Sequence, residues 1–266
     1  MSNLEIYCVT DKELPFLEES DYKLAAVGKG IFSEKYLKCD NGDNIFHKEK
    51  NYSELTFHYW FWKNQLQFNN DNDWIGFCQK RRFWLNSRNI EKNNNILEII
   101  LKSVPNEWEN YDSVICEPLQ LGTKLSKLVK RGWKNILKKP SLIFNHHYIS
   151  IKIHFDLHHG YGVLDKAISV MNEEDKEEFK VFVNENKTFN PHIMFISKKK
   201  FLEKYFQDQF DWLFRCEKIF GFEKLKGYDK TRLYAFLAER YMPFWFRKYS
   251  RTIEWPWIFS EKYIKI

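Results

Sequence analysis

The sequence lacks the cysteine patterns that stabilise small secreted domains and zinc ribbons. Its five cysteines are odd in number, lie far apart and form no C-x-x-C motif; they are Cys8, Cys39, Cys78, Cys116 and Cys216. A disulfide framework needs paired cysteines and a zinc ribbon needs closely spaced ones, so both classes are excluded. We expect reduced thiols, as in a cytoplasmic protein.

The sequence also lacks a long hydrophobic run and a strong excess of one charge. No stretch approaches the ~18 apolar residues of a membrane span, and the N-terminus has no signal-peptide pattern, so we expect a protein on the cytoplasmic side of the membrane. The 42 basic and 36 acidic residues leave a net charge of +6. This mild charge suits nucleotide diphosphates, anionic lipid headgroups or nucleic acid and does not choose among them.

Aromatic side chains, in contrast, are abundant. The 24 Phe, 14 Tyr and 10 Trp make up 18% of the 266 residues, and hydrophobic residues of all kinds make up 44%. Such a chain is not disordered. Most of the rings must lie in a core, which a chain of this length can form as one large α/β domain or as two small ones.

Four short apolar runs predict buried strands, at residues 4–10, 24–27, 74–78 and 112–116. In open α/β sheets, ligands bind beyond the carboxyl ends of such strands. Thr10 ends the first run, and Gly28-Lys29-Gly30 follows the second, so these positions are candidate ligand contacts. A lone G-x-G is equally typical of a plain tight turn, because the third glycine of a dinucleotide motif is missing.

The run at residues 74–78 leads into Gln79-Lys80-Arg81-Arg82. Arginine side chains bind phosphate oxygens bidentately, so Arg81 and Arg82 are candidates to hold an anionic ligand. The alternative is that one arginine caps a helix or pairs with an acid. Asp71-Asn72-Asp73 has the D-x-D pattern of metal-dependent sugar transferases, but it precedes the run, whereas a metal-binding D-x-D is expected after a strand. We therefore predict no metal site there.

Helical spacing of apolar residues predicts helices at residues 50–64, 93–102 and 201–214, and acidic residues after Asn172 predict another helix start. A strand is expected at residues 190–196, before the long amphipathic helix. Residues 124–139 carry seven basic residues and no acidic one. They form either a helix on an anionic membrane or a helix that packs on its own sheet with a solvated basic face.

Five histidines crowd into fourteen residues: His146, His147, His154, His158 and His159. His154 and His158 would share a helix face, as zinc ligands can. However, three isoleucines alternate with polar residues between positions 149 and 153, which indicates an extended chain. No H-E-x-x-H motif is present either, so we predict no zinc site.

Several motifs together resemble the domain-of-unknown-function 4422 family. They are Gly42-Asp43-Asn44, Lys50-Asn51, Tyr52-Ser53-Glu54-Leu55-Thr56, Tyr59-Trp60-Phe61-Trp62-Lys63-Asn64, Gly76-Phe77-Cys78-Gln79-Lys80-Arg81-Arg82-Phe83, Trp212-Leu213-Phe214 and Arg232-Leu233-Tyr234-Ala235-Phe236-Leu237-Ala238-Glu239-Arg240. The family consists of bacterial and phage glycosyltransferases of capsular or cell-wall polysaccharide synthesis, some linked to galactofuranose transfer. The sequence departs from the family at Gln79-Lys80, where His-Tyr is usual. This departure leaves open a member that keeps the fold and has lost the activity.

The resemblance implies an α/β fold of the GT-A type, in which a nucleotide-sugar-binding sheet is flanked by helices and followed by helical C-terminal additions. It implies a single domain over residues 1–266. The nucleotide-sugar half would span about residues 1–120, and the acceptor half with the C-terminal helices about residues 121–266.

The resemblance also suggests roles for individual residues. The nucleotide-sugar would contact Thr10, Gly28, Lys29, Asp43, Asn44, Glu54, Arg81 and Arg82, and the acceptor would contact His158, His159, Asn190, His192 and Arg240. On composition alone, Gly42-Asp43-Asn44 is a turn, and Glu54 either pairs with a basic residue or binds ligand hydroxyls. Glu239 is the leading candidate for the base that takes the acceptor proton, with Asp211 as a second catalytic candidate. The alternative for Glu239 is a structural pair with an arginine.

The implied reaction moves a hexosyl group, galactofuranosyl or galactosyl, from a UDP-sugar to a saccharide or lipid-linked saccharide. The protein would be cytoplasmic, in peripheral contact with the inner face of the membrane, and would bind no nucleic acid. The sequence identifies no cofactor with certainty; Mn²⁺ or Mg²⁺ stays open but is not expected without a D-x-D after a strand. The alternative function is a non-catalytic basic and aromatic module for nucleic acid or an anionic membrane surface.

Overall fold

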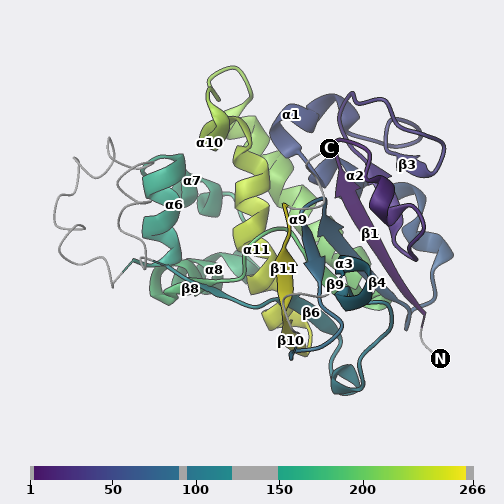
Figure 1. Cartoon of the computed structure of the whole chain (residues 1–266). Coiled ribbons are helices and arrows are strands. Elements are labelled where there is room, and N and C mark those ends of the chain that lie inside the picture. The colour runs from purple at the N-terminus through teal and green to yellow at the C-terminus, as the bar shows by residue number, and fades with distance from the viewer. Residues whose placement is uncertain (1–2, 90–94, 122–148, 262–266) are drawn as a thin grey trace. The chain divides into compact units, whose positions relative to one another are not determined.

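The structure is a computed structural model, and it describes residues 3–89, 95–121 and 149–261 (Figure 1). The chain divides into two compact units. Unit 1 comprises Met1–Glu117, His192–Asp208 and Trp245–Ile266, and unit 2 comprises Pro118–Pro191 and Gln209–Phe244. The first crossing between units lies close to residue 120, where the sequence suggested a change of role. The chain then returns twice to unit 1, which the sequence did not indicate.

The centre of unit 1 is a mixed sheet that has nine strands among the described residues. Its main path runs in the order β10-β6-β9-β4-β1-β2-β3; off this path, β5 pairs with β4, and β11 pairs with β5. The strands are β1 (Leu4–Thr10), β2 (Lys23–Ala26), β3 (Tyr36–Lys38), β4 (Trp74–Gln79), β5 (Arg82–Trp84), β6 (Ser113–Cys116), β9 (Phe195–Lys198), β10 (Thr252–Trp255) and β11 (Trp257–Phe259). All four strands predicted from apolar runs are therefore confirmed.

Four neighbouring strands, β3, β2, β1 and β4, run parallel to one another. In this register Cys8 lies opposite Cys78, and Thr10 lies opposite Ala26. Strand β9 pairs antiparallel with β4 on one side and with β6 on the other. The carboxyl ends of β1, β2 and β4 therefore meet at one edge of the sheet.

One face of this sheet is covered by aromatic side chains from α2 (Leu55–Asn64). The ring of Phe61 contacts Tyr7 of β1 at 4.8 Å and Phe77 of β4 at 5.4 Å between centroids. Phe195 of β9 contacts Phe206, which lies on the part of α9 (Lys199–Phe220) that belongs to unit 1. Because strands of a parallel sheet are buried on both faces, their sequences read as continuous apolar runs.

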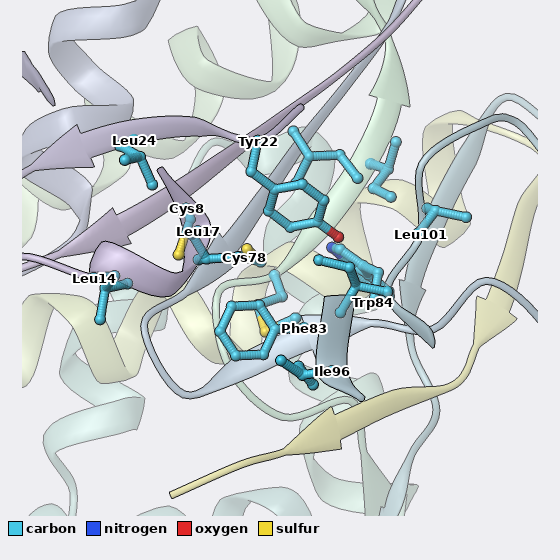
Figure 2. Packing of buried hydrophobic residues seen from close by; sticks show 14 of the residues in the cluster. Cys8, Leu14, Leu17, Tyr22, Leu24, Cys78, Phe83, Trp84, Ile96 and Leu101 are labelled. Atoms are coloured by element: carbon cyan, nitrogen blue, oxygen red, sulfur yellow. The ribbon is translucent and has the colours of Figure 1, made fainter. Parts of the chain in front are cut away.

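The opposite face is closed by a second apolar cluster, part of which is shown in Figure 2. Leu14 and Leu17, from the turn around η1 (Pro15–Leu17), pack with Cys8, Phe83 and Trp84 in this cluster. α3 (Ile96–Ile99) and η4 (Asn106–Trp108) add Ile96, Ile99 and Trp108. All five cysteines are buried, and none of them is joined in a disulfide.

In its described residues, 118–121, 149–191 and 209–244, unit 2 is helical apart from one short strand pair. Its elements are α6 (Ile151–His159), α7 (Val163–Ser169), α8 (Glu173–Glu185), α10 (Tyr228–Thr231), the remaining part of α9, and most of α11 (Leu233–Tyr249). β7 (Leu119–Gln120) pairs antiparallel with β8 (Thr188–Phe189). Phe179, Trp212, Tyr241 and Phe244 form its aromatic core. The predicted helical C-terminal additions are thus present. None of the described helices has the length and apolar character needed to cross a membrane.

Two local predictions were wrong, each for a physical reason, and one strand is present but begins later than expected. Residues 149–153 are not extended: the Ser150 hydroxyl accepts a hydrogen bond from the Ile153 amide at 3.3 Å and caps α6. Of the helix expected at 93–102, the described residues form only α3, because Ile100 makes an isolated β-bridge with Leu85 and the Leu101 amide donates to the Trp84 carbonyl at 2.9 Å. The strand expected at 190–196 begins only at Phe195.

At the other predicted positions, the helices of the structure are closer to the prediction. Residues 50–64 form two helices, α1 (Glu49–Tyr52) and α2, because Ser53 adopts a left-handed φ of 55° between them. Helix α8 begins after Asn172 as predicted, but the Asn172 side chain accepts a hydrogen bond from Arg215 at 2.8 Å instead of capping the helix. The basic stretch 124–139 lies outside the described residues.

A buried carboxylate joins three strands of unit 1. Asp112, before β6, accepts hydrogen bonds from Lys198 at 2.9 Å and from Arg251 at 2.8 Å. Burial alone would raise the pKa of Asp112, but these two partners outweigh it and lower the pKa to about 2. A carboxylate with a depressed pKa stabilises the folded state above its unfolded pKa, and that contribution is lost as the pH falls through the folded value.

Replacing Asp112 with Asn should therefore destabilise unit 1 at pH 7 by roughly 1–2 kcal/mol, since the exposed Arg251 is partly screened by water. The stability difference between wild type and variant should shrink as the pH falls from about 4 to about 2. Urea denaturation at a series of pH values measures both effects. Asp71→Asn is the control, because Asp71 pairs with Lys199 at an exposed position and should change stability little. A pH-independent difference for Asp112→Asn would contradict this assignment.

Candidate functional site

The loops after β1, β2 and β4 leave the sheet from one place in unit 1. The Val27 amide donates to the Thr10 carbonyl at 2.8 Å, and the Lys80 amide donates to the Val9 carbonyl at 3.2 Å. The Thr10 hydroxyl bonds to the backbone of Lys12, donating to its carbonyl at 2.5 Å and accepting from its amide at 3.2 Å. The Thr10 hydroxyl thus stabilises the turn by which the chain leaves β1. The two backbone hydrogen bonds place the three loops side by side.

Residues Gln79–Arg82, which we call the basic hairpin, connect β4 to β5 at this edge. The Lys80 ammonium pairs with Asp11 of the loop after β1. The Gln79 amide nitrogen donates to Glu54, at the start of α2, and the Gln79 amide oxygen accepts from Arg82 at 2.9 Å. Glu54 and Arg82, both predicted to bind the donor, are thus brought together by Gln79, the residue at which the sequence departs from the family pattern.

Arg81 is positioned by the segment that follows β11. The Ser260 amide donates to the Arg81 carbonyl at 2.9 Å, and Glu261 lies 3.5 Å from the Arg81 guanidinium. The Phe259 ring lies under both arginines, with its centroid 5.9 Å from the guanidinium carbon of Arg81 and 5.3 Å from that of Arg82. The Arg81 side chain is still 39% exposed, so it is accessible to an anion from solvent.

The other predicted donor residues lie at different positions of unit 1. Gly28 follows β2 with a left-handed φ of 76°, and Lys29 next to it is exposed. Asp43 accepts a hydrogen bond from the Tyr59 hydroxyl at 3.2 Å, and its carbonyl accepts from Asn64 at 2.8 Å. Asn44 closes its own loop by accepting from the Phe46 amide at 3.1 Å.

The loop Gly42–Asn44 therefore packs against the C-terminal end of α2. An added Cβ at Gly42 would lie 2.1 Å from the Asn64 side-chain oxygen, so only glycine fits this approach. Glu54 stands at the other end of this ten-residue helix, about 15 Å away along its axis. The structure thus gives Asp43 and Asn44 a structural role and does not bring them to the basic hairpin.

A second polar cluster lies within unit 2, between α6 and α11. Arg240 is 2% exposed and pairs with its neighbour Glu239, whose side chain is 15% exposed. The Arg240 guanidinium also lies 3.4 Å from the His154 ring nitrogen and 4.7 Å from the Phe189 ring centroid. The structure therefore contains the Glu–Arg pair that the sequence offered as the alternative to a catalytic base.

Two histidines of this cluster, His154 and His159, are held neutral. Burial lowers the pKa of His159 to about 3, and the nearby positive charge of Arg240 lowers it further in the same direction. The pKa of His154 falls well below its usual value for the same two reasons. His159 bonds to the Asp229 carbonyl at 2.6 Å, and His158 bonds to the His154 carbonyl at 2.9 Å. Neutral imidazoles can donate and accept hydrogen bonds, as sugar recognition requires.

The remaining predicted residues are dispersed. Asp211 is exposed on α9, and Asn190 is fully buried directly after β8. His192 belongs to unit 1, where it has a left-handed φ of 67° and its ring packs edge-on against Trp257 at 4.9 Å. Thus the unit 2 cluster holds His158, His159, Arg240 and Glu239, while His192 lies in the other unit.

The acids that resemble a D-x-D motif lie at the opposite edge of the sheet from the basic hairpin. Asp71 pairs with Lys199 at 2.9 Å, and Asp73 accepts hydrogen bonds from the Asn70 amide at 2.9 Å and the Asn3 amide at 3.3 Å. Both precede β4, as the sequence indicated. Across the described part of the chain, no group of three or more His, Cys, Asp or Glu side chains is arranged to hold a metal ion.

Sequence reasoning missed three contributors to the candidate anion site. Asp11, Phe259 and Glu261 contact the cations of the basic hairpin from loops distant in sequence. Asp11 could have been found from its place directly after a predicted strand. The other two carry no signal, because their approach depends on the pairing of β11 with β5.

Comparison with known proteins agrees with the motifs. The sequence model of a family described as a domain of unknown function (DUF4422) matches residues 5–250. The apo structure of the WbbM bifunctional glycosyltransferase is similar to this chain, with a TM-score of 0.64 and 20% sequence identity. The match covers 98% of this chain and 46% of that one, so this chain spans less than half of the WbbM chain. No curated protein matches the sequence. The predicted α/β fold is thereby confirmed.

The pairing of Glu239 with Arg240 predicts a stability effect in unit 2. Glu239→Ala would leave the buried guanidinium without its carboxylate and should lower the free energy of unfolding by about 2–4 kcal/mol. Chemical denaturation measures this change. Glu177→Ala is the control, since Glu177 pairs with Lys180 on an exposed helix face and should have little effect. A Glu239→Ala variant as stable as the control would show that the pair has no structural role.

Proposed function

Because this chain belongs to the DUF4422 family and shares its fold with a glycosyltransferase chain, we propose that it is a glycosyltransferase. The proposed reaction moves a hexosyl group, galactosyl or galactofuranosyl, from a UDP-sugar to a saccharide or lipid-linked saccharide acceptor. Such a transfer would contribute to the synthesis of a surface polysaccharide. The enzyme would act in the cytoplasm, in peripheral contact with the inner face of the membrane.

The observation that carries the proposal is the basic hairpin at the carboxyl ends of β1 and β4. Ligands of open α/β sheets bind at this edge, and three consecutive cations stand there on a short, well-held turn. Guanidinium groups bind phosphate oxygens with two parallel hydrogen bonds. Unit 1 is accordingly assigned to the donor nucleotide, and unit 2 with its histidine cluster to the acceptor.

In the proposed mechanism, the bond between the sugar C1 and the diphosphate oxygen breaks, and the acceptor hydroxyl oxygen forms a new bond to C1. Negative charge then develops on the leaving diphosphate, where Arg81 and Arg82 would stabilise it most. The acceptor hydroxyl gives its proton to a carboxylate. Glu239 is the proposed base, because its partner Arg240 lies 3.4 Å from the His154 ring nitrogen and its own side chain keeps some exposure to solvent. Asp211 is the second candidate because it is exposed.

UDP affinity measured by isothermal titration calorimetry tests the donor assignment. Arg81→Ala should weaken UDP binding by about ten-fold, as expected for the loss of a charge-assisted hydrogen bond. Arg247→Ala is a matched control: Arg247 is 37% exposed and pairs with Glu254, much as Arg81 is 39% exposed and pairs with Glu261. A wild-type protein that binds no uridine nucleotide would sink the proposed function. Equal losses in both variants would remove the role of Arg81.

The contact between Glu261 and Arg81 predicts that removing the Glu261 charge strengthens UDP binding, whereas Arg81→Ala weakens it. A diphosphate must compete with the Glu261 carboxylate for the guanidinium, so Glu261→Gln should tighten UDP binding by about two- to five-fold at low salt. The gain should disappear at high ionic strength, because salt screens exposed pairs. Glu254→Gln, which releases Arg247 instead, should leave UDP affinity unchanged. Weaker UDP binding by Glu261→Gln would show that Glu261 helps to hold the ligand.

A further inference from the structure

The carboxyl end of β2 carries a carboxylate that no motif singled out. An added Cβ at Gly28 would lie 3.7 Å from the carboxyl carbon of Glu49 and 3.8 and 3.9 Å from its two oxygens. The Glu49 carboxylate therefore lies directly beside the backbone where the chain leaves β2. Gly28 also has a left-handed φ of 76°, a backbone conformation that glycine adopts without strain.

Glu49 is held in place by the backbone around it. Its amide donates to the Phe46 carbonyl, and its carbonyl accepts from the Ser53 amide at 2.7 Å. The charge of Glu49 also acts on Cys39, just after β3. Burial raises the pKa of the Cys39 thiol to about 11, and the carboxylates of Asp40 and Glu49 contribute to this rise. The Glu49 backbone is thus anchored, and its carboxylate lies close to the ends of β2 and β3.

At this edge of the sheet, the cations lie at the end of β4, and Glu49 lies two strands away, at the end of β2. Strand β1 lies between β2 and β4, and neighbouring strands are about 4.8 Å apart, so the ends of β2 and β4 are separated by about 10 Å. Asp11 and Glu54 bond to residues of the basic hairpin, at the β4 end. Glu49 is at the β2 end. A ligand that fits this order is neutral and rich in hydroxyls at one end and anionic at the other.

A nucleoside diphosphate has this arrangement. A carboxylate repels phosphate but accepts hydrogen bonds from hydroxyls, and its two oxygens match the two donors of a vicinal diol. We propose that Glu49 binds the ribose 2′- and 3′-hydroxyls of the donor nucleotide, while the basic hairpin binds its diphosphate. This inference rests on the proposed function and adds the residue that would recognise the sugar of the nucleotide.

The test compares the affinities of UDP, 2′-deoxy-UDP and 3′-deoxy-UDP by isothermal titration calorimetry. The wild type should bind at least one deoxy analogue about ten-fold more weakly than UDP. Glu49→Gln should bind UDP about ten-fold more weakly than wild type does, and should discriminate little among the three ligands. Glu18→Gln is the control, since Glu18 pairs with Lys35 elsewhere in unit 1, and it should keep the wild-type preference.

The outcomes separate this inference from the proposed function. If the wild type binds no UDP, the proposed function and the inference both fail. If UDP binds and Glu49→Gln keeps the wild-type preference for ribose, the inference alone fails. Thermal unfolding checks that the variant is folded. If it is not, Glu49→Asp, which keeps the charge on a shorter side chain, should show the same loss of preference, and retention of the preference would overturn the inference.

Discussion

The parallel pairing of β1 with β4 is the constraint on which the candidate donor site depends. It places Tyr7 beside Phe77 on one face of the sheet and Cys8 beside Cys78 on the other. Because side chains alternate between faces, a slip of one residue would move each set into the wrong half of the core. The register is therefore fixed by apolar packing on both sides. As a consequence, the basic hairpin leaves β4 directly beside the end of β1, where it meets Asp11.

Charge is used differently in the two units. In unit 1, two cations of the basic hairpin have polar partners: Asp11 pairs with Lys80, and Gln79, which is bonded to Glu54, accepts a hydrogen bond from Arg82. The Arg81 side chain remains partly exposed to solvent. In unit 2 the pair of Glu239 and Arg240 is largely buried beside histidines whose lowered pKa values keep them neutral at pH 7. Charging these histidines would place a second cation beside Arg240, so their neutrality protects the buried pair. This local balance explains why the net charge said little about the ligand.

Elements fixed by local sequence patterns could be predicted from the sequence, and elements fixed by contacts between distant segments could not. Short apolar runs gave the four strands, because burial on both faces leaves a continuous signal. The stretch at 149–153 was misread because its alternating isoleucines mimic a strand, whereas the Ser150 cap and the apolar contacts of Phe155 fix a helix. For the candidate donor site, the strand ends predicted Arg81, Arg82 and Gly28 as ligand contacts. The contacts of Phe259 and Glu261 could not be predicted, since they depend on a strand pairing between segments about 175 residues apart in sequence.

The departure from the family pattern at Gln79 is compatible with a working site. A side-chain amide has a donor and an acceptor at every pH, and Gln79 uses both, donating to Glu54 and accepting from Arg82. A histidine at this position could make the same two bonds only while neutral, since the charged ring has two donors and no acceptor. The amide thus holds the arginine and the carboxylate in one arrangement over the whole pH range in which both are ionised. Gln79 thus preserves the link between the basic hairpin and α2, and this link does not depend on the protonation of the residue at position 79.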